Sequence, residues 1–141
     1  MIKLERLSPD ILSKIPACKK ALFEEDNIIF AYIFGGLAEG KVKPLSDIDI
    51  AVFLRDTQNL AEIRLKLFDI LAGVFGAGEI DLVILNTATI SLSGRILQRR
   101  QILVDKDPFQ RHLYESVMLR KFFDFKIKED IYFFRRYGVG R

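Results

Sequence analysis

Two acidic residues at the start of an apolar segment are the first feature of this chain that could do chemistry. Asp47 and Asp49 are separated by one residue and lead into the 48–54 segment, whose β-branched and aromatic residues are typical of a buried strand. Alternate side chains of a strand point to the same face, so we expect the two carboxylates about 7 Å apart on one face. Carboxylates so placed suit Mg²⁺, which takes its remaining ligands from waters and substrate phosphates.

A pair of glycines follows the preceding apolar segment. The run Ile28–Phe34 predicts a buried strand, and it ends abruptly at Gly35 and Gly36. Without a Cβ atom, the backbone there can turn sharply and approach a ligand closely. A short helix beginning near Gly36 would aim its free N–H groups at anionic oxygens. We therefore expect the triphosphate of a nucleotide at this turn.

A third carboxylate lies in a later predicted strand. In the 78–85 segment, strand alternation places Glu79, Asp81, Val83 and Leu85 on one face. An aspartate flanked by apolar residues is costly to bury unless it is paired or bound to a metal, so we expect Asp81 to have a partner. If the two strands are neighbours, Asp81 joins Asp47 and Asp49 as a carboxylate triad.

Together these residues carry a resemblance to a known superfamily. Gly35-Gly36, ten intervening residues, Asp47-x-Asp49 and a later strand aspartate resemble the active-site pattern of the DNA polymerase beta-like nucleotidyltransferases. More narrowly, the Ala38-x-Gly40 interval, the 46–50 run and the small chain are similar to the minimal nucleotidyltransferases (MNT domains), the antitoxins of HEPN/MNT toxin–antitoxin systems. The similarity extends from residue 30 to about residue 125. It implies an α/β (α+β) fold, a mixed β-sheet flanked by helices with a C-terminal helical segment.

The resemblance also implies an activity. Such enzymes transfer a nucleoside monophosphate from an NTP, here AMP from ATP, to a hydroxyl acceptor and release pyrophosphate with the help of two Mg²⁺ ions. By matching position, Asp47 and Asp49 would bind both metals, and Asp81 would complete the site of the metal that activates the acceptor. The implied nucleotide-binding residues are Gly35, Gly36 and Ser46.

Two positions depart from the pattern of many MNT domains. Gly36 stands where a serine is common, which removes a hydroxyl contact to phosphate, and Glu39 stands where many members carry a basic residue. Lys41 and Lys43 are available to compensate for the acidic side chain. We expect these departures to affect nucleotide affinity and rate rather than the fold.

The acceptor is constrained by size. A chain of 141 residues has no second lobe to hold a long nucleic acid, so the acceptor is small or is delivered by a partner. The resemblance implies a HEPN ribonuclease toxin encoded by an adjacent gene, a tyrosine of which receives AMP. Two alternatives stay open: transfer to a small hydroxyl compound such as an aminoglycoside-like antibiotic, and a non-catalytic module that masks its partner by contact.

Charge is distributed unevenly along the chain. Residues 1–86 carry 10 basic and 13 acidic residues, whereas residues 87–141 carry 12 and 6. The basic residues of the second half could approach a nucleotide's phosphates, an acidic partner or a nucleic acid. Direct nucleic-acid binding is not favoured, and it would be steeply salt-dependent. The basic residues concerned are Arg95, Arg99, Arg100, Arg120, Lys121, Arg135 and Arg136.

Composition and periodicity predict one domain over residues 1–141, because 50% of the residues are hydrophobic and no linker divides the chain. Residues 1–26 are assigned to an N-terminal helix, 27–104 to the catalytic core and 105–141 to a C-terminal helical segment. No apolar run has membrane-spanning length and no leader is recognisable, so we expect a cytoplasmic protein without a membrane partner. Cys18 is expected to fill the core and His112 to lie at the surface.

The predicted elements follow from apolar spacing and cap residues. The 132–137 segment is too apolar for a free tail, so we expect it to dock on its own core or on another chain. The helices are predicted over Pro9–Phe23, Thr57–Phe75, Ser91–Leu97 and Pro108 to about Phe125 or beyond, and the strands over Ile28–Phe34, Ile48–Leu54, the segment around Asp81 and Gln101–Val104.

Overall fold

The computed structural model describes residues 12–35, 48–76 and 80–138, except for the side chain of residue 137. Its centre is a four-stranded sheet in the order β3-β2-β1-β4. Strand β1 is antiparallel to both β2 and β4, and β2 is parallel to β3, so the mixed sheet is confirmed. The strands are β1 (Ile28–Phe34), β2 (Ile48–Leu54), β3 (Ile80–Ile84) and β4 (Arg100–Asp105).

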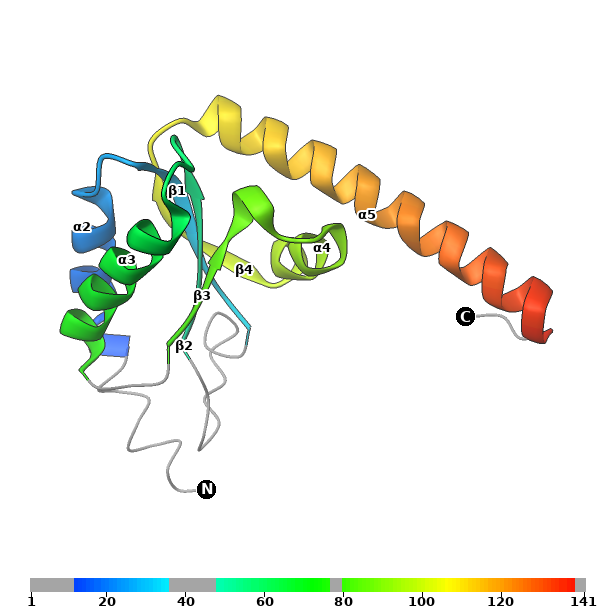
Figure 1. The fold of residues 1–141 in the computed structure, drawn as a ribbon, viewed down its shortest axis with the longest axis horizontal. Coiled ribbons are helices and arrows are strands. Elements are labelled where there is room, and N and C mark those ends of the chain that lie inside the picture. The colour runs from blue at the N-terminus through cyan, green and yellow to red at the C-terminus, as the bar shows by residue number, and fades with distance from the viewer. Residues whose placement is uncertain (1–11, 36–47, 77–79, 139–141) are drawn as a thin grey trace, which may run out of the picture.

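Helices cover both faces of the sheet. Figure 1 shows α2 and α3 on one side of the strands and α4 and α5 on the other. A short 3-10 turn, η1, follows β3 directly. Of the described helices, none is both long and apolar enough to cross a membrane. The helices are α2 (Ile15–Phe23), α3 (Leu60–Phe75), α4 (Ile90–Gln98) and α5 (Pro108–Tyr137), with η1 at Leu85–Thr87.

The two faces of β2 show why the sequence alternates as it does. Ile48, Ile50, Val52 and Leu54 enter the hydrophobic cluster beneath α2 and α3. The intervening side chains point to the opposite face, where α4 and α5 pack. Burying an aliphatic side chain stabilises a fold by about 1.5–3 kcal/mol, so a one-residue slip of this strand would forfeit several such contributions at once.

The N-terminal layer contains the single cysteine. Cys18 of α2 is fully buried, as predicted, and burial raises the pKa of its thiol to about 12. The predicted start at Pro9 lies outside the described residues, but the prediction of one continuous helix to Phe23 is wrong, because the chain turns at Lys14 and α2 begins at Ile15 with a proline in its first turn. His112, predicted at the surface, is exposed on α5.

Helix α5 is anchored to the sheet by a buried polar network centred on Glu115. Tyr32 Oη donates to Glu115 Oε2 at 2.7 Å, and Arg100 Nη2 donates to the same oxygen at 2.9 Å. Arg111 Nη1 donates to Glu115 Oε1 at 3.1 Å, while its Nε donates to Asp105 Oδ2 at 2.8 Å. The network ties α5 to β1 and β4, because its members come from all three elements.

The same network explains the protonation state of its members. Burial alone would raise the pKa of the Glu115 carboxyl, but the Tyr32 hydrogen bond and the charges of Arg100 and Arg111 outweigh it and hold the pKa below its usual value. Burial and the neighbouring Glu115 raise the pKa of the Tyr32 hydroxyl, so Tyr32 remains a neutral donor. These groups serve as a structural anchor.

The far part of α5 departs from the expectation for the chain end. The helix is predicted to reach about Phe125 or beyond, and it continues to Tyr137, where Gly138 ends it with a φ of +68°. Figure 1 shows this part extending away from the sheet and the other helices. Tyr132 and Phe134 keep 52% and 59% of their surface exposed, so of the two expected docking modes, packing on the chain's own core is wrong for these residues.

Candidate functional site

Two of the three predicted acidic residues lie side by side at one end of the sheet. Asp49 is near the start of β2 and Asp81 near the start of β3, and the parallel register pairs them directly. Paired residues of neighbouring strands point to the same face, with strands about 4.8 Å apart. The pairing extends across the sheet, because Phe34 at the end of β1 is opposite both Asp49 and Arg100.

This row lies on the face that carries α4 and α5. The neighbours of Asp49 along β2 on this side, Ala51 and Phe53, belong to the cluster that packs beneath α5, and Val83 of β3 joins them. The two carboxylates therefore project from a rigid sheet at the margin of a packed layer. A rigid sheet suits a site whose groups must be held within a fraction of an ångström.

Gly35 completes the described part of the site. It has a φ of +76°, a conformation that a side chain disfavours, and a Cβ atom built there would stand 2.6 Å from Asp49 Oδ2. The backbone at the end of β1 thus lies against the Asp49 carboxylate at a distance that only glycine permits. This close approach gives a physical reason for glycine at the predicted turn.

Asp81 differs from expectation in one respect. The sequence indicated a costly burial that would demand a partner, but the Asp81 side chain is exposed, whereas Asp49 is half-buried. The burial argument for Asp81 was therefore wrong, because β3 is the edge strand of the sheet, with a neighbouring strand on one side only, and the Asp81 side chain stays exposed there. Asp81 lies beside Asp49 because β2 and β3 pair in parallel at these two positions, not because Asp81 is buried.

Several predicted residues lie outside the described residues. These include Asp47, Gly36, Ser46, Glu39 and the two lysines of that loop. Within the described ranges, no group of three or more His, Cys, Asp or Glu side chains is arranged to hold a metal. The triad and its metal site therefore stay predictions, with Asp49 and Asp81 as the two members whose positions are known.

Beside Gly35 lies a cavity of about 330 Å³ that the sequence alone did not reveal. Helix α4 supplies most of its wall, and Arg95 and Arg99 are its charged residues. Arg100, grouped with these two by sequence, is instead turned to Glu115 at 2.9 Å. The residues that line the cavity are Phe34, Gly35, Leu92, Arg95, Ile96, Gln98 and Arg99.

A larger cavity of about 480 Å³ lies at the other end of the sheet, where β1 begins and β2 ends. Its lining includes Asn27, Arg55 and Glu62 but none of the predicted site residues. The hydrogen bonds between Asn27 and the backbone of Asp56, at 2.8 and 2.9 Å, close the connection between strand and loop there. These hydrogen bonds give Asn27 a structural role at this end of the sheet.

Comparison with solved structures finds toxin–antitoxin complexes. A chain of the tri-AMPylated Shewanella oneidensis HEPN toxin in complex with MNT antitoxin matches with a TM-score of 0.65 and 22% identity, covering 85% of this chain and 92% of that one. A mutant MntA–HpeT complex matches at 0.63 and 22%, covering 84% and 91%. A toxin–antitoxin with AMP-PNP matches at 0.57 and 22%, covering 89% and 91%. At these identities the likeness establishes the fold.

The family is established by the sequence itself. No curated protein matches the chain. The family model described as polymerase beta, nucleotidyltransferase, matches residues 17–109, which is more than half of the chain and runs from α2 through the sheet to the first residues of α5. The matched region contains the paired Asp49 and Asp81 and the glycine turn. The chain therefore belongs to the polymerase beta nucleotidyltransferase family.

Proposed function

We propose that this protein transfers AMP from ATP to a hydroxyl acceptor with release of pyrophosphate. The observation that carries the proposal is the row at the sheet end, in which Asp49 and Asp81 are register partners and Gly35 lies against Asp49. Paired carboxylates beside a glycine turn supply both halves of nucleotidyl transfer, a place for cations and a place for phosphates. Family membership gives the same reaction class.

The donor set fits Mg²⁺. Asp49 and Asp81 present hard oxygen ligands from adjacent strands, and Asp47 is expected on the same face as Asp49 two residues earlier. Mg²⁺ bound there would lower the pKa of the acceptor hydroxyl and neutralise charge on the leaving pyrophosphate. Two ions are expected, held by Asp47, Asp49 and Asp81.

The reaction balances without a further reagent. The acceptor oxygen forms a bond to the α-phosphorus of ATP, and the bond from that phosphorus to the oxygen that bridges to the β-phosphorus breaks. Pyrophosphate leaves with that bonding pair. The hydroxyl proton passes to the carboxylate of Asp81, which is exposed and can release it to solvent. The protein contributes mainly positioning and charge neutralisation.

The acceptor in this proposal is a tyrosine of a HEPN ribonuclease encoded by an adjacent gene, with this chain as its antitoxin. Two of the similar structures support it by what they contain: an AMPylated HEPN toxin with its MNT antitoxin, and a toxin–antitoxin with AMP-PNP. The helix α5 supports it too. Its far part carries an exposed apolar stripe, here called the distal stripe, of Phe123, Ile127, Ile131 and Phe134.

The distal stripe has the spacing of a helix-binding face. Its members follow one another at intervals of three and four residues, so they lie along one side of α5. Each is between 46% and 59% exposed, which is unusual for four large apolar residues along one side of a helix. A helical partner is the occupant proposed, because helices recognise one another through such seams.

Incubating the protein with labelled ATP, Mg²⁺ and the product of the adjacent gene tests the proposal. Label is expected on a tyrosine of that product. Asp49→Asn is expected to slow transfer by at least about 10³-fold, or roughly 4 kcal/mol of barrier, because an amide cannot neutralise a cation. Asp69→Asn, an exposed change on α3, is the matched control and should transfer normally.

Three outcomes would each reject a part of the proposal. Near wild-type transfer by the Asp49→Asn variant would reject the assignment of Asp49. Full neutralisation of the toxic partner by Asp49→Ala, with no label on the partner, would favour masking by contact over catalysis. Absence of label with several nucleotides would reject nucleotidyl transfer to this partner.

A further inference from the structure

We propose that the cavity beside Gly35 binds the β- and γ-phosphates of the nucleoside triphosphate, with Arg95 and Arg99 as its cationic residues. The inference rests on the proposed function and assigns residues on and just after α4 to it. These residues lie outside the glycine turn and the acidic row.

The position of the cavity links it to the acidic row. Gly35 lines the cavity and also lies against the carboxylate of Asp49. Phe34, the register partner of Asp49 on β1, lines the cavity as well. The cavity therefore adjoins the carboxylate of Asp49, which is expected to bind metal. A triphosphate reaching from that metal would enter this space.

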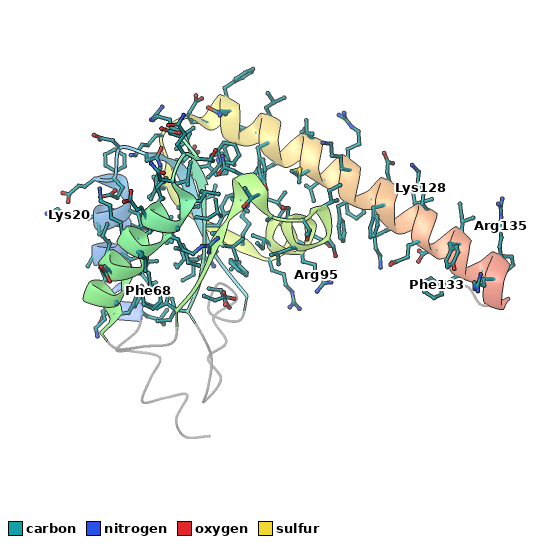
Figure 2. The ribbon with its side chains drawn as sticks, in the orientation of Figure 1. Lys20, Phe68, Arg95, Lys128, Phe133 and Arg135 are labelled. Carbon is teal, nitrogen blue, oxygen red and sulfur yellow. The ribbon has the colours of Figure 1, made fainter. Side chains whose placement is uncertain are left out.

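The wall is built by one face of α4. Leu92 lies three residues before Arg95 and four before Ile96, so these residues share a side of α4, and Arg99 follows directly after the helix ends at Gln98. Figure 2 shows Arg95 projecting from α4 on the side away from α5. The two arginines thus reach the cavity from the last turns of α4 and from the residue that ends the helix.

The opposite face of α4 fixes this orientation. Ser93 is fully buried, and a Cβ atom at Gly94 would overlap the ring of Phe122 on α5. Glycine at this position therefore lets α4 pack closely against α5. Because the close contact permits little rotation of α4, the side that bears Arg95 stays turned to the cavity.

The chemistry of the lining favours an anion with several oxygens. Among the described residues that line the cavity, two are arginines, one is a glutamine and none is acidic. Guanidinium groups bind phosphate with paired hydrogen bonds, and the apolar neighbours Leu92 and Ile96 strengthen such contacts by excluding water. Arg95 Nη2 donates to Ser91 Oγ at 3.3 Å, a long bond that a phosphate oxygen can replace.

Nucleotide binding in the absence of any acceptor tests the inference. Calorimetric titration of the full chain with ATP and Mg²⁺ would compare wild type, Arg95→Ala, Arg99→Ala and the double variant. Each single change is expected to raise the Kd for ATP about 10-fold, and the double change by about 100-fold or more, because charge-assisted phosphate contacts are lost. Arg120→Ala, an exposed change on α5, is the matched control and should bind as wild type.

A second titration with AMP locates the contact along the nucleotide. AMP lacks the β- and γ-phosphates, so its Kd should change less than about 3-fold in the same variants. Equal losses for ATP and AMP would place the arginines at the nucleoside or the α-phosphate and overturn the inference. Thermal melts of each variant serve as the control that the fold is kept.

The outcomes separate this inference from the proposed function. If wild type transfers AMP to the partner but Arg95→Ala/Arg99→Ala binds ATP normally, the inference is wrong and the function stands. A raised KM for the partner protein with unchanged ATP affinity would assign the arginines to the acceptor instead, and would also overturn it. If wild type binds no nucleoside triphosphate, the function itself fails and the inference with it.

Discussion

A methyl group at position 35 would come within 2.6 Å of an oxygen of Asp49, closer than atoms that are not bonded can pack. Gly35→Ala is therefore expected to displace the Asp49 carboxylate, strain a backbone with a φ of +76°, and lower the free energy of unfolding by about 1–3 kcal/mol. Because Asp49 loses its position, AMP transfer should fall far more than stability. Denaturant titration and the transfer assay, run on the same preparation, measure the two effects.

Gly73 offers a matched control for that change. It lies inside α3, and a Cβ atom at this position would have nothing within 4 Å, so Gly73→Ala should leave transfer unchanged and stabilise the helix by about 0.5–1 kcal/mol. If Gly35→Ala behaved like Gly73→Ala in both assays, the contact between Gly35 and Asp49 would have no functional weight.

At the level of elements, Glu115 is the central hydrogen-bond acceptor between α5 and the sheet. Glu115→Ala would leave Arg100, Arg111 and the Tyr32 hydroxyl without their shared acceptor, and a broken buried ion pair costs about 3–5 kcal/mol. We expect a loss of about 3 kcal/mol in the free energy of unfolding. Asp124→Ala, an exposed change on the same helix, should stay within about 0.5 kcal/mol of wild type.

The same residue gives a pH dependence of known sign. The pKa of Glu115 is lower in the folded protein than its ordinary value of 4.5, so its stabilisation is fully present above about pH 4.5 and is lost as pH falls through the folded pKa. The stability gap between wild type and Glu115→Gln should therefore narrow on acidification. A gap that stays constant from pH 7 to about pH 3 would show that the carboxylate charge contributes nothing there.

The elements also show what sequence patterns can and cannot determine. The apolar runs predicted β1 and β2 with their observed bounds, because both strands are buried in their central residues and end at glycine or polar positions. The sequence predicted that Asp81 lies beside Asp49 only if their two strands are neighbours in the sheet. The register of these strands depends on how α3 crosses between β2 and β3, and no local pattern encodes that.

The cavity residues illustrate the same limit. The sequence grouped Arg95, Arg99 and Arg100 as basic residues with several uses. Their separation, two to the cavity and one to Glu115, depends on the rotation of α4 and on the pairing of β4 with β1. The start of α3 was similarly misplaced at Thr57, because Asn59 adopts a left-handed conformation with a φ of +59° and the helix begins only at Leu60.

At the scale of the whole molecule, the shape separates the site from the proposed partner contact. The acidic row lies at one end of the sheet, and Figure 1 shows the far part of α5 reaching away from the body of the protein. A partner held on the distal stripe would be anchored independently of the groups that act on its tyrosine. Binding and transfer should therefore be separable by mutation.

Replacing Ile127 and Ile131 by glutamate tests this separation. Two charges on the distal stripe should abolish capture of the adjacent-gene product in a pull-down and slow its labelling. ATP binding and the melting temperature should stay near wild type, because both side chains are about half exposed. Phe125→Glu is the matched control, since residue 125 is exposed on the opposite side of the same helix and should leave capture intact. Capture that survives in the double variant, or is lost equally in the control, would move the partner contact away from the stripe.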